Sequence, residues 1–269
     1  MTFLEILILG IVQGITEFLP ISSDGHLCVA NALINSWGGD PVKDFVEVEI
    51  ILHLGTLLAV LVFYRHEIAK MFSSERRVIL LVLLGTIPAA IIGIYLKKGL
   101  PTALSDAILQ SPLLAGLGFP VTAAFLWWTT RLPEGDGFYP QLSWKNSLII
   151  GAMQSLALLP GVSRSGSTIA AGLGVGLQRE SAATFSFLLA IPAIAGGGLL
   201  EMIDVLQDGA TGTPIGILAA GFLISFVVGL AALASLMRFV RKGKLMLFVY
   251  YLVPLGIAVT AWQLGLRYL

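Results

Sequence analysis

Charge is scarce in this sequence. Only 32 of its 269 residues are charged, 16 of each sign, so the net charge is zero. Soluble domains carry about 25% charged residues, whereas this chain has 12% charged and 57% hydrophobic residues. That hydrophobic content excludes a disordered chain, and the lack of a basic face excludes nucleic acid as a partner. A polytopic membrane protein is the class that remains.

Cysteine and N-terminal basic residues are also nearly missing. The single Cys28 cannot form an internal disulfide. The first five residues lack the basic run of a secretory signal, and we expect them to stay in the mature protein.

Long apolar runs are plentiful. A bilayer core of about 30 Å takes about 20 apolar residues per helix. The sequence predicts six spans, at 44–64, 77–97, 110–130, 181–206, 214–238 and 245–267. Two further apolar regions, 3–36 and 146–177, are each interrupted by a polar cluster with Pro and Gly. Such a break is tolerated at membrane depth only where protein or water covers it, so we expect two re-entrant hairpins of half-helices.

The loops differ in basic charge. Eleven of the 16 Lys and Arg residues fall on one predicted side, which should be cytoplasmic, and four fall on the other. Both termini are then expected outside. The eleven are Arg65, Lys70, Arg76, Arg77, Arg131, Lys145, Arg179, Arg238, Arg241, Lys242 and Lys244, and the four are Lys43, Lys97, Lys98 and Arg267.

The two broken regions resemble each other. A shift of 141 residues aligns Gly10 with Gly151, Gln13 with Gln154, Ser22 with Ser163 and Gly25 with Gly166. Each region precedes three spans, and an odd number of spans inverts the second copy. We therefore expect an all-α single membrane domain over 1–269, with a first repeat at 1–130 and an inverted second repeat at 144–269. Sites in inverted repeats typically lie near the midplane at broken helices, here where the hairpin tips would meet.

The first break carries an acidic residue on a helix. Gln13 and Glu17 are four residues apart, so they share a helix face. A carboxylate is costly in lipid, and we interpret Glu17 as a metal ligand or general base rather than as a residue satisfied by neighbouring helices.

The residues after Pro20 add further polar groups. Ser22, Ser23 and Asp24 are typical of a helix N-terminus and predict the start of the second half-helix. Asp24 is a cap, a metal ligand or both. His26 adds a titratable group that capping does not explain, and we favour chemistry over a structural role. His53, in the first full span, either lines the same cavity or packs between helices.

The second break holds Arg164, which is the only cation far from a span end. A buried Arg needs an anionic partner. Serines beside glycine at a half-helix N-terminus supply N–H groups, hydroxyls and the positive end of the helix dipole. With a guanidinium these groups make a phosphate cradle. The alternative is an ion pair of Arg164 with Glu17, which can coexist with function.

Together these residues resemble the undecaprenyl-diphosphate phosphatase family associated with bacitracin resistance, over nearly the whole chain. Two motifs carry the resemblance. The first is Gln13-Gly14-Ile15-Thr16-Glu17 followed by Pro20-Ile21-Ser22-Ser23-Asp24-Gly25-His26, and the second is Pro160-Gly161-Val162-Ser163-Arg164-Ser165-Gly166-Ser167-Thr168.

The resemblance implies an integral-membrane phosphatase that hydrolyses undecaprenyl diphosphate to undecaprenyl phosphate and inorganic phosphate, which recycles the lipid carrier for cell-wall synthesis. It also implies a divalent cation, Mg²⁺ first and Ca²⁺ as the alternative, and a homodimer in the bacterial inner membrane with its site facing the periplasm. A transporter or flippase for an anion or for the lipid carrier is the competing function, because inverted repeats with broken helices are common in transporters.

By motif position, the resemblance assigns three sets of residues. The catalytic set is Glu17, Ser23, His26 and Arg164, and the nucleophile is left open between water, Ser23 and His26. The substrate-binding set is Ser22, Ser163, Arg164, Ser165, Gly166 and Thr168. The metal set is Glu17, Gln13 and Asp24. Two residues depart from the family pattern: Gln13 is neutral where Glu also occurs, and Asp24 stands where Ser or Thr is more usual, so Asp24 is expected to restore the missing negative charge.

Overall fold

The structure, a computed structural model, describes residues 2–36, 45–208 and 213–267. Within these residues the regular elements are helices, and the one β-bridge joins Gly137 to Leu177. The long helices are α3 (Phe45–Phe63), α5 (Arg77–Ile94), α7 (Pro112–Thr129), α10 (Arg179–Asp208), α11 (Ile215–Arg241) and α12 (Met246–Arg267). The shorter elements are α4 (Arg65–Phe72), the π-helical turn η1 (Tyr95–Gly99), α6 (Thr102–Leu109) and the 3₁₀ turn η2 (Tyr139–Gln141).

The predicted spans correspond to the long helices. Helices α5, α7, α10, α11 and α12 are long and apolar enough to cross a membrane, and α3 with α4 makes a sixth span that is bent by 72° at its break. The chain is therefore an all-α, multi-pass membrane protein. The basic segment at 65–77 is not simply a loop as predicted, because α4 is helical. Its residues, such as Glu67, Ala69 and Lys70, are good helix formers. Lys43 lies outside the described residues.

The two broken regions form helical hairpins. Helix α1 (Phe3–Thr16) turns into α2 (Ser23–Ser36), and α8 (Trp144–Leu156) turns into α9 (Arg164–Gly174). Each turn contains its proline, Pro20 or Pro160, whose ring lacks the N–H that helix continuation needs. The breaks thus fall where the sequence predicts them.

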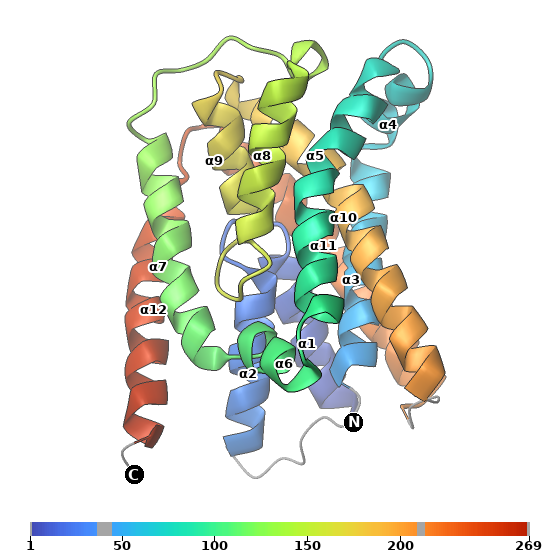
Figure 1. The fold of residues 1–269 in the computed structure, drawn as a ribbon, viewed down its shortest axis with the longest axis vertical. Coiled ribbons are helices and arrows are strands. Elements are labelled where there is room, and N and C mark those ends of the chain that lie inside the picture. The colour runs from blue at the N-terminus through green and yellow to red at the C-terminus, as the bar shows by residue number, and fades with distance from the viewer. Residues whose placement is uncertain (1, 37–44, 209–212, 268–269) are drawn as a thin grey trace.

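The hairpins point toward each other. In Figure 1 the α1–α2 hairpin rises from the end of the molecule that holds both termini, and the α8–α9 hairpin descends from the opposite end. Helices α3, α5 and α7 run up, down and up, whereas α10, α11 and α12 run down, up and down. This order agrees with opposite orientations of the two halves. The repeat boundaries at 1–130 and 144–269, and the re-entrant position in a bilayer, stay predictions.

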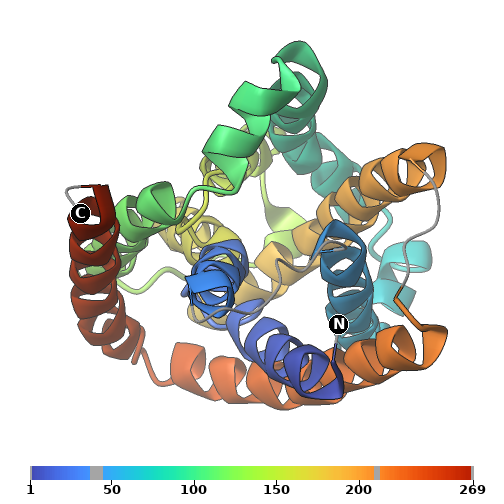
Figure 2. The ribbon, with the colours of Figure 1, turned by 90° about the horizontal axis from the view of Figure 1, so that it is seen from below.

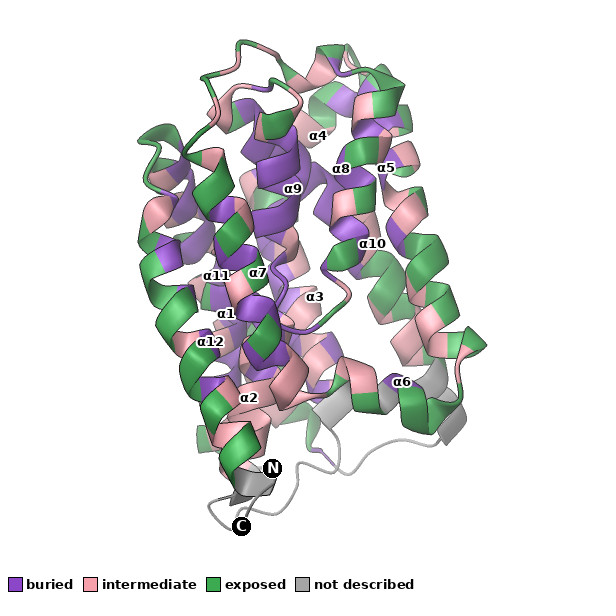
Figure 3. Ribbon diagram, turned by 60° about the vertical axis from the view of Figure 1, so that its left-hand side comes forward, coloured by how far each residue is buried: buried purple, intermediate pink, exposed green. Residues whose placement is uncertain are grey.

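The long helices surround the hairpins. Helix α1 packs on α11, α8 packs on α5, and α7 runs along α12. Seen from the end with the termini, α2 lies near the middle of the ring of longer helices (Figure 2). Helix α9 is almost wholly buried, whereas α7 and α12 present exposed outer faces (Figure 3). These exposed faces carry large apolar side chains such as Leu117 and Ile257, as a lipid-facing surface requires.

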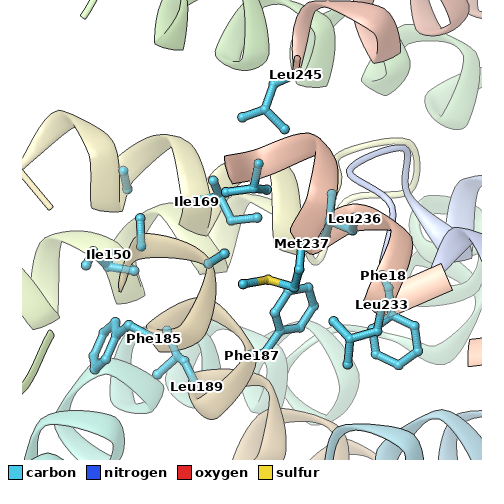
Figure 4. Close-up of a cluster of buried hydrophobic side chains, with 14 of the residues drawn as sticks. Phe18, Ile150, Ile169, Phe185, Phe187, Leu189, Leu233, Leu236, Met237 and Leu245 are labelled. Atoms are coloured by element: carbon cyan, nitrogen blue, oxygen red, sulfur yellow. The ribbon is translucent and has the colours of Figure 1, made fainter. Parts of the chain in front are cut away.

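An apolar core holds the hairpins in place. Its central side chains are fully or almost fully buried and come from the first turn, α8, α9, α10 and α11 (Figure 4). They include Phe18, Ile150, Ile169, Phe185, Phe187, Leu233 and Leu236. Phe18 follows the site residue Glu17 directly, and its ring lies 5.8 Å from that of Phe187. The core therefore fixes the position of the first turn against α10.

Candidate functional site

The two turns touch through glycines. A Cβ atom on Gly25 would come within 2.7 Å of the backbone nitrogen of Gly161, so only a residue without a side chain permits this approach. Gly161 itself has φ of +85°, a conformation that glycine adopts freely. The hydroxyl of Ser165 also donates to the carbonyl of Leu19 at 3.4 Å. The structure thus brings the tips of the two hairpins together.

Arg164 and Glu17 form an ion pair across this contact. The Nη2 of Arg164 donates to Oε1 of Glu17 at 2.9 Å, and the side chains are only 15% and 4% exposed. Glu17 is the C-cap of α1, and Arg164 is the first residue of α9. Both charges oppose the macrodipole of their own helix. The placement therefore does not serve the stability of either helix, and each charge depends on the other.

The second oxygen of Glu17 collects two donors. Ser23 donates its hydroxyl to Oε2 of Glu17 at 2.7 Å, and Nε2 of Gln13 donates to the same oxygen at 3.2 Å. Ser22, just before Ser23, has φ of +73°, which is uncommon for a residue with a side chain. Such conformations cluster at active sites. This turn directs Ser23 to Glu17, giving a hydroxyl and a carboxylate within hydrogen-bond reach.

Asp24 and His53 extend the cluster. The Nε2 of His53 lies 3.6 Å from Oε2 of Glu17 and 3.6 Å from Oδ1 of Asp24. Its Nδ1 is 2.9 Å from the carbonyl of Glu49, one turn earlier in α3. His53, for which the sequence left two interpretations open, therefore belongs to the site. Its signal in the sequence was only that of a polar residue in an apolar span.

The second hairpin is braced by Thr122, which the sequence analysis did not single out. The hydroxyl of Thr122, on α7, donates to the carbonyl of Gly161 at 2.9 Å and accepts from the backbone N–H of Ser163 at 2.8 Å. Ser163 in turn caps α9, since its hydroxyl accepts from the N–H of Gly166 at 3.1 Å. No local pattern marks Thr122, because its partners lie about forty residues away.

The predicted phosphate cradle is only partly free for a ligand. Thr168 donates to the carbonyl of Arg164 at 2.7 Å and lies 2.5 Å from the hydroxyl of Ser186, so its hydroxyl is engaged inside the protein. The hydroxyls of Ser163 and Ser165 lie 3.2 Å apart. Among the described residues, Nη1 of Arg164 is a buried donor without a hydrogen-bond partner. A buried donor of this kind calls for an acceptor such as a phosphate oxygen.

The hydrogen-bond partners of His26 lie outside the cluster around Glu17. Its Nδ1 is 2.7 Å from the carbonyl of Ser22, and its Nε2 is 2.8 Å from the hydroxyl of Tyr251 on α12. Each ring nitrogen makes one in-plane hydrogen bond, so neither nitrogen faces Glu17 in this structure. The structure therefore brings together Gln13, Glu17, Ser23, Asp24 and Arg164, and it places His26 beside them with different partners.

The oxygen ligands suit a hard cation that a substrate helps to bind. In the described parts of the chain, no group of three or more His, Cys, Asp or Glu side chains is arranged to hold a metal ion. Mg²⁺, however, usually binds through one or two carboxylates together with water and substrate phosphates. Oε1 of Gln13 is buried without a partner among the described residues, next to Glu17. Gln13, Glu17 and Asp24 thus fit such a cation.

A polar cavity borders Asp24. It has a volume of about 300 Å³ and lies between α2, α3 and the connection from α6 to α7. Cys28, Asn31 and Glu49 also line it. The α6–α7 connection lies toward the end of the molecule that holds both termini (Figure 1). The cavity thus lies on the side of the site that is nearer to this end.

The fold and the site define an integral membrane protein with a carboxylate, a hydroxyl and a guanidinium gathered where two helical hairpins meet. The family model described as bacitracin resistance protein BacA matches residues 6–258, and the chain belongs to this family. Curated relatives named undecaprenyl-diphosphatase are similar along their whole length. The protein from Rhodopirellula baltica is 43% identical over 97% of this chain and 98% of its own. Those from Desulfatibacillum aliphaticivorans and Methanosphaera stadtmanae are 39% and 38% identical, each over at least 94% of both chains.

Proposed function

We propose that this protein is an undecaprenyl-diphosphate phosphatase, which hydrolyses the terminal phosphoanhydride of the lipid and releases undecaprenyl phosphate and inorganic phosphate. The observation that carries the proposal is the arrangement of Arg164, Glu17 and Ser23 at the contact of the two hairpin tips. Family membership and the relatives named undecaprenyl-diphosphatase support it. The product would re-enter cell-wall synthesis as the lipid carrier.

Arg164 would bind the diphosphate. Its guanidinium has a buried Nη1 donor to offer, and it stands at the N-terminus of α9, whose dipole also favours an anion. Phosphoryl transfer depends mainly on positioning and on neutralisation of the charge on the transferred group. When the diphosphate binds, the Arg164 guanidinium would contact a phosphate oxygen and its hydrogen bond with Glu17 would weaken. The hydroxyls of Ser163 and Ser165 would contact the same anion beside Gly166, while the N–H groups of Ser163 and Gly166 keep their bonds to Thr122 and Ser163.

Ser23 is the nucleophile that the geometry favours among water, Ser23 and His26. Its hydroxyl already donates to Glu17 at 2.7 Å, which is the reach that a general base requires. In this scheme the Oγ–P bond forms at the terminal phosphorus, the bridging P–O bond breaks, and Glu17 takes the Ser23 proton. Undecaprenyl phosphate leaves. Glu17 passes the Ser23 proton to the departing undecaprenyl phosphate and is again a carboxylate. It then takes a proton from the attacking water and returns it to Oγ of Ser23 as the phosphoserine P–O bond breaks and inorganic phosphate leaves.

A divalent cation, Mg²⁺ or Ca²⁺, is part of the proposal. Gln13, Glu17 and Asp24 would hold it, and it would supply positive charge against the diphosphate oxygens. Asp24 would contribute the negative charge that the neutral Gln13 does not.

The placement in the cell is proposed on the charge count and the resemblance. The end with both termini, to which the cavity at Asp24 is nearer, would face the periplasm, and the basic end with α4 would face the cytoplasm. We further propose the bacterial inner membrane as the location and a homodimer as the assembly, which light scattering of the detergent-solubilised protein tests.

Phosphate release in detergent tests the activity, because no gradient or second compartment exists there. Purified protein is mixed with undecaprenyl diphosphate, with Mg²⁺ or with chelator, and inorganic phosphate is measured. The proposal predicts release that requires the cation. Movement of the lipid across vesicles, without any phosphate release by folded protein, would instead make the protein a transporter or flippase.

A further inference from the structure

The hydrogen bonds of His26 define which of its two ring nitrogens carries the proton. The carbonyl of Ser22 can only accept, so Nδ1 of His26, 2.7 Å away, carries a proton. The other nitrogen, Nε2, lies 2.8 Å from the hydroxyl of Tyr251 and therefore accepts a hydrogen bond from that hydroxyl when the ring is neutral. The single lone pair of the imidazole is thus directed at Tyr251.

The ring of His26 also contacts two aromatic rings. The ring of Tyr251 lies beside it and nearly parallel, with centroids 5.7 Å apart and 10° between the planes, and Phe119 of α7 lies at 5.0 Å and 60°. Such aromatic contacts add to the hydrogen bonds in fixing the ring. Ser22, Tyr251 and Phe119 together leave the imidazole little freedom to turn.

The hydrogen bond to His26 also satisfies the hydroxyl of Tyr251. Its side chain is 46% exposed on α12, which faces outward, and its hydroxyl donates to His26. In a bilayer a hydroxyl without a partner is costly, because no water replaces the lost bond. The bond joins residues 225 positions apart and links the first hairpin to the last helix.

We propose that Tyr251 is a positioning residue for His26: its hydroxyl and ring orient the imidazole, with Nε2 as the accepting nitrogen, at the edge of the site where the diphosphate is cleaved. This rests on the proposed function. Tyr251 acts through His26 and does not touch the reacting atoms. A water molecule that donates to Nε2 takes the place of the Tyr251 hydroxyl and finds the ring already oriented.

One substitution tests the hydroxyl of Tyr251, and a second substitution serves as its control. Tyr251→Phe deletes the hydroxyl and keeps the aromatic ring, and Tyr250→Phe is the matched control, since Tyr250 is the 68% exposed neighbour on the same helix. We expect Tyr251→Phe to lower kcat between about three- and tenfold, the worth of one hydrogen bond, with little change in KM. In a His26→Ala background the same substitution should have no further effect. Tyr250→Phe should match the wild type.

A chemical readout does not depend on turnover. Diethyl pyrocarbonate modifies the free ring nitrogen of histidine, and mass spectrometry reports the rate separately for His26, His53 and His66. We expect Tyr251→Phe to raise the rate at His26 alone, because Nε2 loses its hydrogen-bond partner. An unchanged rate at His26, or equal losses of kcat in the presence and absence of His26, would overturn the proposal. A wild type that releases no phosphate would refute the proposed function instead, and the labelling rates would still decide the role of Tyr251.

Discussion

Removing one partner of the Arg164–Glu17 pair should destabilise the protein far more than breaking an exposed pair. In Arg164→Ala the carboxylate of Glu17, 4% exposed, loses its guanidinium. Loss of one partner from a buried pair costs about 3–5 kcal/mol. Ser23 and Gln13 still donate to Glu17, which keeps the expected loss near the lower end, about 3 kcal/mol.

The chain offers a matched control. Arg241 and Glu180 lie 2.6 Å apart with side chains 60% and 54% exposed, and such pairs contribute about 0–1 kcal/mol. Unfolding in mixed micelles, followed by circular dichroism, gives the free energy of unfolding for the wild type, Arg164→Ala, Arg241→Ala, Glu17→Gln and the double variant Glu17→Gln/Arg164→Ala. The double variant should cost less than the sum of its two singles, because no charge is left without its partner. An Arg164→Ala variant within about 1 kcal/mol of Arg241→Ala would refute the buried pair.

Three further predictions follow from the turns and the site. Ser23→Ala should lower phosphate release by about a thousandfold or more if Ser23 is the nucleophile; near-normal release by Ser23→Ala would assign the attack to water or His26. Gly161→Ala should lower the melting temperature more than Gly176→Ala, since both have positive φ but only Gly161 faces a neighbouring backbone, that of Ala115 on α7; equal losses would mean that the second turn does not pack closely on α7. Asp24→Ala should raise the Mg²⁺ concentration needed for half-maximal release, and an unchanged requirement would remove Asp24 from the cation site.

The sequence predicts the architecture because membrane helices leave local signals. Apolar length locates the spans, and the polar clusters with Pro20 and Pro160 locate both breaks. The main exception is α4, where a run of charged helix formers continues α3 beyond a sharp bend instead of forming a loop. Length and hydropathy alone do not reveal a short charged helix of this kind.

The site is less accessible to sequence reasoning because its contacts join distant segments. The sequence offers the Glu17–Arg164 ion pair only as an alternative to a phosphate site, because either charge needs a partner in lipid. His53 could be named only as a polar residue in a span, and its distances to Glu17 and Asp24 depend on how α3 packs. Thr122 and Tyr251 gave no signal at all, although they hold the second turn and His26.

The central claim is that the meeting point of the hairpins cleaves the lipid diphosphate. The most direct test is single-turnover release of terminal, radiolabelled phosphate from undecaprenyl diphosphate by wild type, Glu17→Gln, Arg164→Ala and Arg241→Ala, each shown to be folded in the same detergent. The account predicts fast release by the wild type and Arg241→Ala, and loss of release in both variants at the hairpin tips. Release at the wild-type rate by folded Glu17→Gln or Arg164→Ala would place the chemistry elsewhere in the protein.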